Sequence, residues 1–79
     1  MVKKNKTTTK ETKTEEIKLS KRETEILEHL SKGLKYSDIA NNLIISPATV
    51  RKHIENIYKK LHVHNKMEAV IKARQHKLI

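Results

Sequence analysis

A group of charged and polar side chains recurs at helical spacing in the second half of the sequence. The side of one expected helix that the buried apolar stripe leaves free carries Arg51, Lys52, Glu55 and Lys59, together with the small residue Ala48. Arginine can donate two parallel hydrogen bonds to guanine O6 and N7 or to a phosphate, and lysine is a point donor to the same atoms. Glutamate can accept a hydrogen bond from cytosine N4. These residue types therefore indicate recognition of a polyanion that also presents hydrogen-bonding edges.

The helix that would carry this group has the clearest beginning in the chain. Ser46 is expected to be its N-cap, and Pro47 fits the first helical position, where a missing N–H costs nothing. Apolar residues then follow at positions i, i+4, i+7 and i+11, which defines one buried stripe. The stripe consists of Val50, Ile54, Ile57 and Leu61. We therefore predict a helix over 47–61 whose basic side faces solvent.

The segment before this helix predicts two further helices. The first, over 20–32, begins with a capping box of Ser20 and Glu23, and Gly33 is expected to end it in the left-handed conformation. A short second helix over 36–43 buries Ile39, Ala40 and Leu43. The next three residues form the turn, because two isoleucines are too few for a strand that could join a sheet.

The segment after the basic helix predicts a fourth helix, over 65–76. Asn65 is a suitable N-cap, and Glu68 follows three residues later. Small apolar residues form a narrow buried stripe that would let this helix approach its neighbours closely: Ala69, Val70 and Ala73. A second, partly exposed apolar set consists of Met67, Ile71 and Leu78.

The distribution of charge is more informative than its total. The 79 residues carry a formal net charge of +9, which divides into +3 over residues 1–18, zero over 19–46 and +6 over 47–79. Residues 1–18 are rich in lysine and threonine and contain few apolar residues, so they are expected to form a flexible, disordered basic arm or a linker. Residues 19–79 form the single folded domain. Its charge is concentrated on the last two helices, as expected when a helix faces a phosphate-lined groove.

The composition excludes several classes of protein. The chain has no cysteine, which rules out disulfide scaffolds and Cys-ligated zinc folds, and a single glycine argues against phosphate-cradling loops. His62 and His64 have no third ligand at suitable spacing, so no metal site and no cofactor are expected. The scattered histidines lack the spacing of a catalytic triad, and an enzyme is not expected. The sequence has no span long enough to cross a membrane and no secretory signal, which favours a cytoplasmic protein.

Several segments of the sequence together resemble a known family. The segments LSKRETEIL (19–27) and DIANNLIISPATVRKHIENIYKKL (38–61), with EAV (68–70), resemble the LuxR-type helix-turn-helix domain of NarL/FixJ response regulators and GerE-like regulators. The resemblance covers residues 19–79. It implies an all-α, four-helix domain whose third helix enters the major groove of double-stranded DNA, in a bacterial transcriptional regulator or the output domain of a two-component response regulator.

The resemblance also assigns roles to residues. It implies a phosphate contact for Thr49 and base contacts for Arg51 and Lys52, and it places His53 near the phosphates, although packing on the helix flank is the alternative. Lys59 and Lys60 are expected at the DNA backbone. The candidate DNA-binding residues are Ser46, Ala48, Thr49, Arg51, Lys52, His53, Glu55, Lys59 and Lys60.

Two positions depart from the family pattern. Glu55 replaces the usual polar or basic residue. It either accepts from cytosine N4, pairs with Arg51, Lys52 or Lys59 at helical spacing, or is a solvated charge. The second helix begins with Lys35, Tyr36 and Ser37 instead of a capping residue, which weakens its N-cap by about 1 kcal/mol.

The resemblance further implies a homodimer formed through the fourth helix on DNA, with RNA polymerase as a further partner. The candidate dimer residues are Met67, Ile71, Arg74 and Leu78. Two alternative functions remain open: a helical protein–protein interaction module that docks through the same apolar strip, and a nonspecific architectural DNA binder. The chain is expected to be either the output domain of a longer regulator or a stand-alone protein.

Overall fold

The computed structural model describes residues 17–79 and shows four α-helices. Their bounds are α2 at Lys21–Ser31, α3 at Tyr36–Leu43, α4 at Pro47–Leu61 and α5 at Lys66–Gln75. The all-α, four-helix fold expected from the sequence is confirmed, and each helix lies within two residues of its predicted bounds. The predicted arm falls on residues 1–18 and lies, apart from Ile17 and Lys18, outside the described residues.

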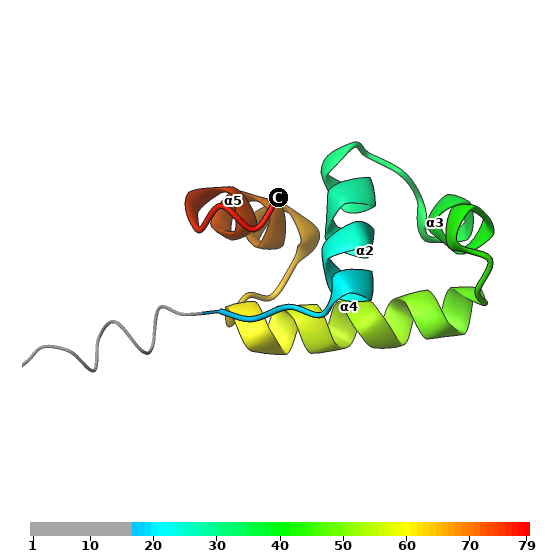
Figure 1. Cartoon of the computed structure of the whole chain (residues 1–79), viewed down its shortest axis with the longest axis horizontal. Coiled ribbons are helices and arrows are strands. Elements are labelled where there is room, and N and C mark those ends of the chain that lie inside the picture. Colours follow the sequence, from blue (N-terminus) through cyan, green and yellow to red (C-terminus); the bar gives the residue numbers. More distant parts are fainter. Residues whose placement is uncertain (1–16) are drawn as a thin grey trace, which may run out of the picture.

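The helices are arranged around α4, the longest of them. Figure 1 shows the other three on one side of α4, with α3 at its N-terminal end, α2 crossing its middle and α5 near its C-terminal end. Both α2 and α3 contact α4, and α5 contacts α2 and α4. Within the described residues, one side of α4 is therefore left without a covering helix.

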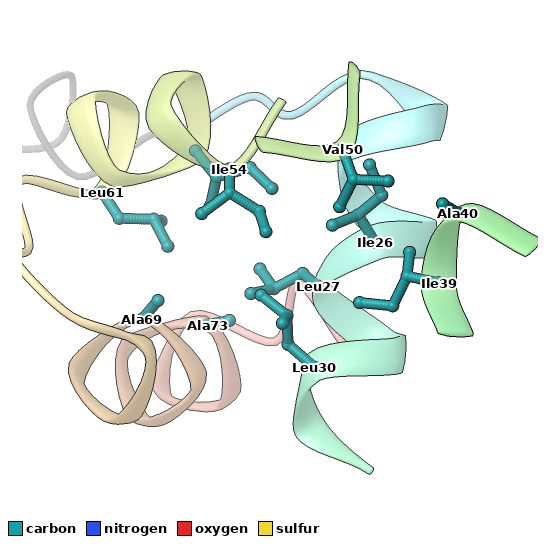
Figure 2. Packing of buried hydrophobic residues seen from close by; sticks show 11 residues of the cluster. Ile26, Leu27, Leu30, Ile39, Ala40, Val50, Ile54, Leu61, Ala69 and Ala73 are labelled. Atoms are coloured by element: carbon teal, nitrogen blue, oxygen red, sulfur yellow. The ribbon is translucent and has the colours of Figure 1, made fainter. Parts of the chain in front are cut away.

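The core lies between α4 and the three helices above it. Ile26 and Leu27 of α2 meet Val50 and Ile54 of α4, and Ile39 of α3 closes the same cluster (Figure 2). From α5, Ala69 and Ala73 face this cluster and are fully buried, as the small-residue stripe predicted. Val70 is only half-buried.

The chain before α2 also contributes to the core. Ile17 and Leu19 are half-buried and pack against the buried cluster. The folded part of the molecule therefore includes Ile17, a residue that the sequence pattern groups with the basic arm.

Each helix ends with a residue in the left-handed region. Gly33 follows α2 at φ 85°, with Leu34 N–H donating to the His29 carbonyl, the hydrogen-bond pattern of a Schellman motif. The other three helices end in the same way at non-glycine residues, Ile44, His62 and Lys77. Ile44 is the most strained of these because a β-branched side chain disfavours positive φ.

The start of α3 has no side-chain cap, as the sequence predicted for Lys35. Tyr36, the first residue of α3, is half-buried and packs against the core beside Tyr58 of α4. Burial and the neighbouring Tyr36 phenol together raise the pKa of Tyr58 to about 12. Contact between the two tyrosines helps to position α3 against α4 where capping does not.

Candidate nucleic-acid interface

The N-terminus of α4 is held by its cap. The Ser46 hydroxyl accepts from the Thr49 backbone N–H at 3.1 Å and lies 2.9 Å from the Thr49 hydroxyl. Pro47 occupies the first turn, and no acidic residue lies there to offset the partial positive charge of the helix end. The first turn of α4 is therefore a rigid, exposed and electropositive terminus that carries two hydroxyl groups.

The uncovered side of α4 carries most of the predicted DNA-binding residues. These residues are exposed: Ser46, Ala48, Thr49, Arg51, Lys52, Glu55, Lys59 and Lys60. His53 and Asn56 are half-buried on the flank of the helix. One continuous face thus brings the predicted residues together, with the buried stripe of α4 opposite them.

The charged groups near the start of this face are not held by ion pairs in the described part of the chain. The two ion pairs recorded among residues 17–79 join Arg22 to Glu25 and Lys60 to Glu23. Arg51 and Lys52 are therefore available to a ligand, and their geometry allows contacts both to phosphate oxygens and to base edges.

Lys60 differs from the rest of the group because it has an intramolecular partner. Its ammonium lies 2.7 Å from Oε1 of Glu23, whose side chain is 6% exposed. Burial alone would raise the pKa of Glu23, but hydrogen bonds from Lys60 and from the Ser20 backbone, together with the charge of Lys60, hold it below its ordinary value. Glu23 is therefore ionised at neutral pH and ties the start of α2 to the end of α4.

The predicted dimer residues lie on α5. Met67 is 71% exposed and Ile71 is 50% exposed, one turn apart on the same face. Arg74 is exposed on the following turn, whereas Leu78 is half-buried and packs against the core. Met67, Ile71 and Arg74, which we call the α5 strip, form an open apolar surface with a cation at its end.

His62 and His64, which follow α4, take part in the turn between α4 and α5. His62 caps α4 in the left-handed conformation, and the His64 N–H donates to the Glu68 carboxylate at 2.9 Å. Among the described residues, no three histidine or acidic side chains are grouped so that they could hold a metal ion. No helix in this part of the chain combines the length and apolar character that a membrane crossing requires.

Sequence reasoning missed the pairing of Lys60 with Glu23. The two residues are 37 positions apart, and no local pattern links them. A signal was nevertheless present, because Glu23 directly precedes the buried run of α2 on the same helical face as Ile26, Leu27 and Leu30. A carboxylate on a buried face requires a cation or several donors.

Comparison with protein families gives a match over most of the chain. Residues 18–73 match the family described as bacterial regulatory proteins, luxR family. Among proteins of known function, the chain is 44% identical over 61 residues to the response regulator protein VraR of Staphylococcus aureus (strain Mu3), covering 77% of the chain and 29% of VraR. It is 34% identical over 64 residues to the Fimbriae Z protein of Salmonella typhimurium (strain LT2), covering 81% of the chain and 30% of that protein.

Two solved structures are similar in fold. The response regulator ChrA of a heme-sensing two-component system superposes with a TM-score of 0.77 and 47% identity, covering 81% of this chain and 32% of ChrA. The transcription factor GerE superposes with a TM-score of 0.73 and 35% identity, covering 76% of this chain and 90% of GerE. The chain thus spans about a third of VraR, of ChrA and of the Fimbriae Z protein, and nearly all of GerE.

Proposed function

The chain belongs to the luxR family of bacterial regulatory proteins and is a DNA-binding transcription-regulator domain, and we propose that it reads DNA sequence with the exposed face of α4. This proposal is supported mainly by the uncovered basic face of α4 and by the capped N-terminus of that helix. A major groove about 12 Å wide admits one helix, so this face can reach base edges.

The roles proposed for the residues follow from their chemistry. Arg51 and Lys52 contact bases, since their side chains follow the first turn of α4 on its exposed face. Ser46, Thr49 and Lys59 contact phosphates, and Ala48 lets the helix approach the groove closely. His53 lies at the edge of this interface. The Lys60 side chain is partly exposed and can also approach a phosphate, but its ammonium is paired with the Glu23 carboxylate.

Dimer formation is proposed through the α5 strip. Met67 and Ile71 expose apolar area that a second copy of α5 would bury. Two copies related by a two-fold axis would bind half-sites about 10 base pairs apart. Leu78, the fourth residue of this predicted set, is half-buried and packs against the core, so only its exposed part can join the surface.

The place of this domain in a regulator is also a proposal. Similarity to the response regulators VraR and ChrA supports an output domain whose activity is controlled by a receiver domain. We propose that this output domain acts on RNA polymerase in the bacterial cytoplasm. The reading frame upstream of Met1 tests this: an in-frame receiver domain supports the proposal. A stop codon immediately upstream contradicts it and leaves a GerE-like regulator.

Selection of bound duplexes from a random DNA pool tests sequence reading. The wild-type chain should enrich a two-fold motif, and Arg51→Ala should relax the base preference at one position of each half-site. Lys32→Ala is the matched control, because Lys32 is an exposed cation at the end of α2. Selection of the same motif by wild type and Arg51→Ala would contradict the proposed role of Arg51.

A further inference from the structure

Glu55 is the one acidic residue in α4, and it lies on the exposed face among cations. A carboxylate on a surface that faces DNA repels phosphate oxygens. It therefore weakens binding to every duplex that does not place a hydrogen-bond donor opposite it. Such a residue can still increase selectivity, because selectivity depends on the difference in affinity between sequences. The position of Glu55 therefore requires an explanation in terms of what it could accept.

The spacing places Glu55 next to the proposed base-reading residues. It follows Arg51 by four residues and Lys52 by three, so the three exposed side chains lie on one stripe of α4. Four residues advance a helix by about 6 Å, close to the rise of two base pairs at about 3.4 Å each. If α4 lies along the groove, Arg51 and Glu55 can therefore reach the edges of base pairs one or two steps apart.

No competing role occupies the carboxylate in the described part of the chain. Neither ion pair recorded among residues 17–79 involves Glu55. The cap of α4 uses Ser46 and backbone groups, so Glu55 has no part in it. Exposed pairs with Arg51 or Lys59 at helical spacing would be weak, and a better donor would displace them.

The chemistry of the major groove distinguishes the bases that a carboxylate can face. An ionised carboxylate only accepts hydrogen bonds. Guanine presents two acceptors in the groove, thymine presents an acceptor and a methyl group, and adenine presents its N6 donor beside the N7 acceptor. Cytosine presents the N4 donor without an adjacent acceptor on the same base, so it repels a carboxylate least.

We propose that Glu55 selects cytosine by accepting a hydrogen bond from its N4 amino group, one or two base pairs from a guanine contacted by Arg51. This inference rests on the proposed function, because it requires α4 to lie in the major groove. It predicts that the domain binds half-sites in which a guanine and a cytosine are separated by at most one base pair.

The experiment compares the full chain with Glu55→Gln and with Glu28→Gln as the matched control. Glu28 is an exposed glutamate on α2, so its variant makes the same charge change away from α4. Each protein selects duplexes from a random pool, and dissociation constants are then measured for the best wild-type duplex and for duplexes with the cytosine replaced. Circular dichroism shows that each variant is folded.

Replacing the cytosine should weaken wild-type binding about tenfold or more, and Glu28→Gln should show the same penalty. Glu55→Gln should lose most of this penalty and should accept adenine, because glutamine can bond to adenine N6 and N7. Its preference for the guanine should persist, since Arg51 is unchanged.

The outcomes separate this inference from the proposed function. The inference is overturned if the wild-type motif lacks the cytosine, or if Glu55→Gln binds all sequences more tightly with the same base preferences. In both cases a motif that depends on Arg51 leaves the proposed function intact. A wild-type chain that enriches no motif contradicts the proposed function itself and this inference with it.

Discussion

The ammonium of Lys60 lies 2.7 Å from Oε1 of Glu23, and the same oxygen accepts the Ser20 backbone N–H at 2.8 Å. A single carboxylate oxygen therefore closes the capping box of α2 and joins the start of α2 to the end of α4. Because Glu23 is buried, this contact adds to the apolar packing that holds α2 across α4, a crossing that Figure 1 shows. The crossing in turn determines which face of α4 remains free for DNA.

Replacing Lys60 should destabilise the fold. Lys60→Met leaves the buried Glu23 carboxylate without its cation, and we expect a loss of about 1–2 kcal/mol in the free energy of unfolding, measured by urea titration. The value is lower than for a fully buried pair because the Lys60 side chain is 43% exposed. Lys59→Met is the matched control, since no ion pair is recorded for Lys59 in the described residues, and its effect should be small.

A double-mutant cycle assigns this loss to the ion pair. In a Glu23→Gln background, glutamine can keep the capping-box hydrogen bond from Ser20 while removing the buried charge. Adding Lys60→Met to that variant should then cost much less than adding it to the wild type. Equal costs in the two backgrounds would show that Lys60 acts through packing alone.

The lowered pKa of Glu23 predicts a loss of stability in acid. The folded state holds the carboxylate ionised to a lower pH than the unfolded state, whose value is near 4.5. The stabilisation is therefore complete above about pH 5 and declines as the pH falls through the folded-state pKa. Urea titrations of wild type and Glu23→Gln at several pH values measure the contribution of the Glu23 carboxylate to the free energy of unfolding. Their difference in stability should shrink below pH 4.5, and a constant difference would refute the linkage.

Relief of backbone strain at Ile44 should stabilise the domain. Ile44 has φ 58° and is 89% exposed, so its side chain contributes little packing to offset the conformation. Ile44→Gly should raise the free energy of unfolding by up to about 1 kcal/mol. Glycine removes the cost of the left-handed backbone, and part of this gain is lost because glycine increases the entropy of the unfolded chain. A thermal melt measures this change, and a lower melting temperature would contradict it.

The reverse substitution provides the comparison. Gly33 has φ 85°, and a Cβ added there would meet no atom within 4 Å. Gly33→Ala should therefore lower stability by about 1 kcal/mol through backbone strain alone. An unchanged or raised melting temperature would show that the end of α2 adjusts without cost.

The α5 strip predicts a separable effect on assembly. Ile71→Glu places a charge on a half-exposed apolar position, so it should weaken dimer formation on a two-fold DNA site at least tenfold while binding to a single half-site persists. His76→Glu, at the half-buried C-cap of α5 and off the line of Met67 and Ile71, is the control. Gel-shift titrations on one-site and two-site duplexes measure both, and equal effects of the two variants would argue against the α5 strip.

Local signals explain why the helices could be predicted from the sequence. Ser20, Ser46 and Asn65 each cap the helix that they were expected to begin, since an N-cap depends on residues within one turn. The buried stripe of α4 followed from spacing alone. The exposed face opposite it then placed Arg51, Lys52 and Glu55 together on one surface.

The features that sequence reasoning missed depend on tertiary structure. Ile44, His62 and Lys77 adopt positive φ without a glycine to indicate it, because core packing on both sides of each turn imposes the conformation. Leu78 is partly exposed, as expected, but the sequence did not indicate that it also packs against the core after the turn at Lys77. The pairing of Lys60 with Glu23 joins distant segments, so no local pattern could predict it.

The central claim is that the exposed face of α4 reads sequence, and a competition titration tests it most directly. The wild-type chain is bound to its selected duplex and challenged with a scrambled duplex of the same length and composition, at a fixed salt concentration near physiological. We predict an affinity ratio of at least about 10³ in favour of the selected duplex. Equal affinity for the two duplexes would contradict the claim.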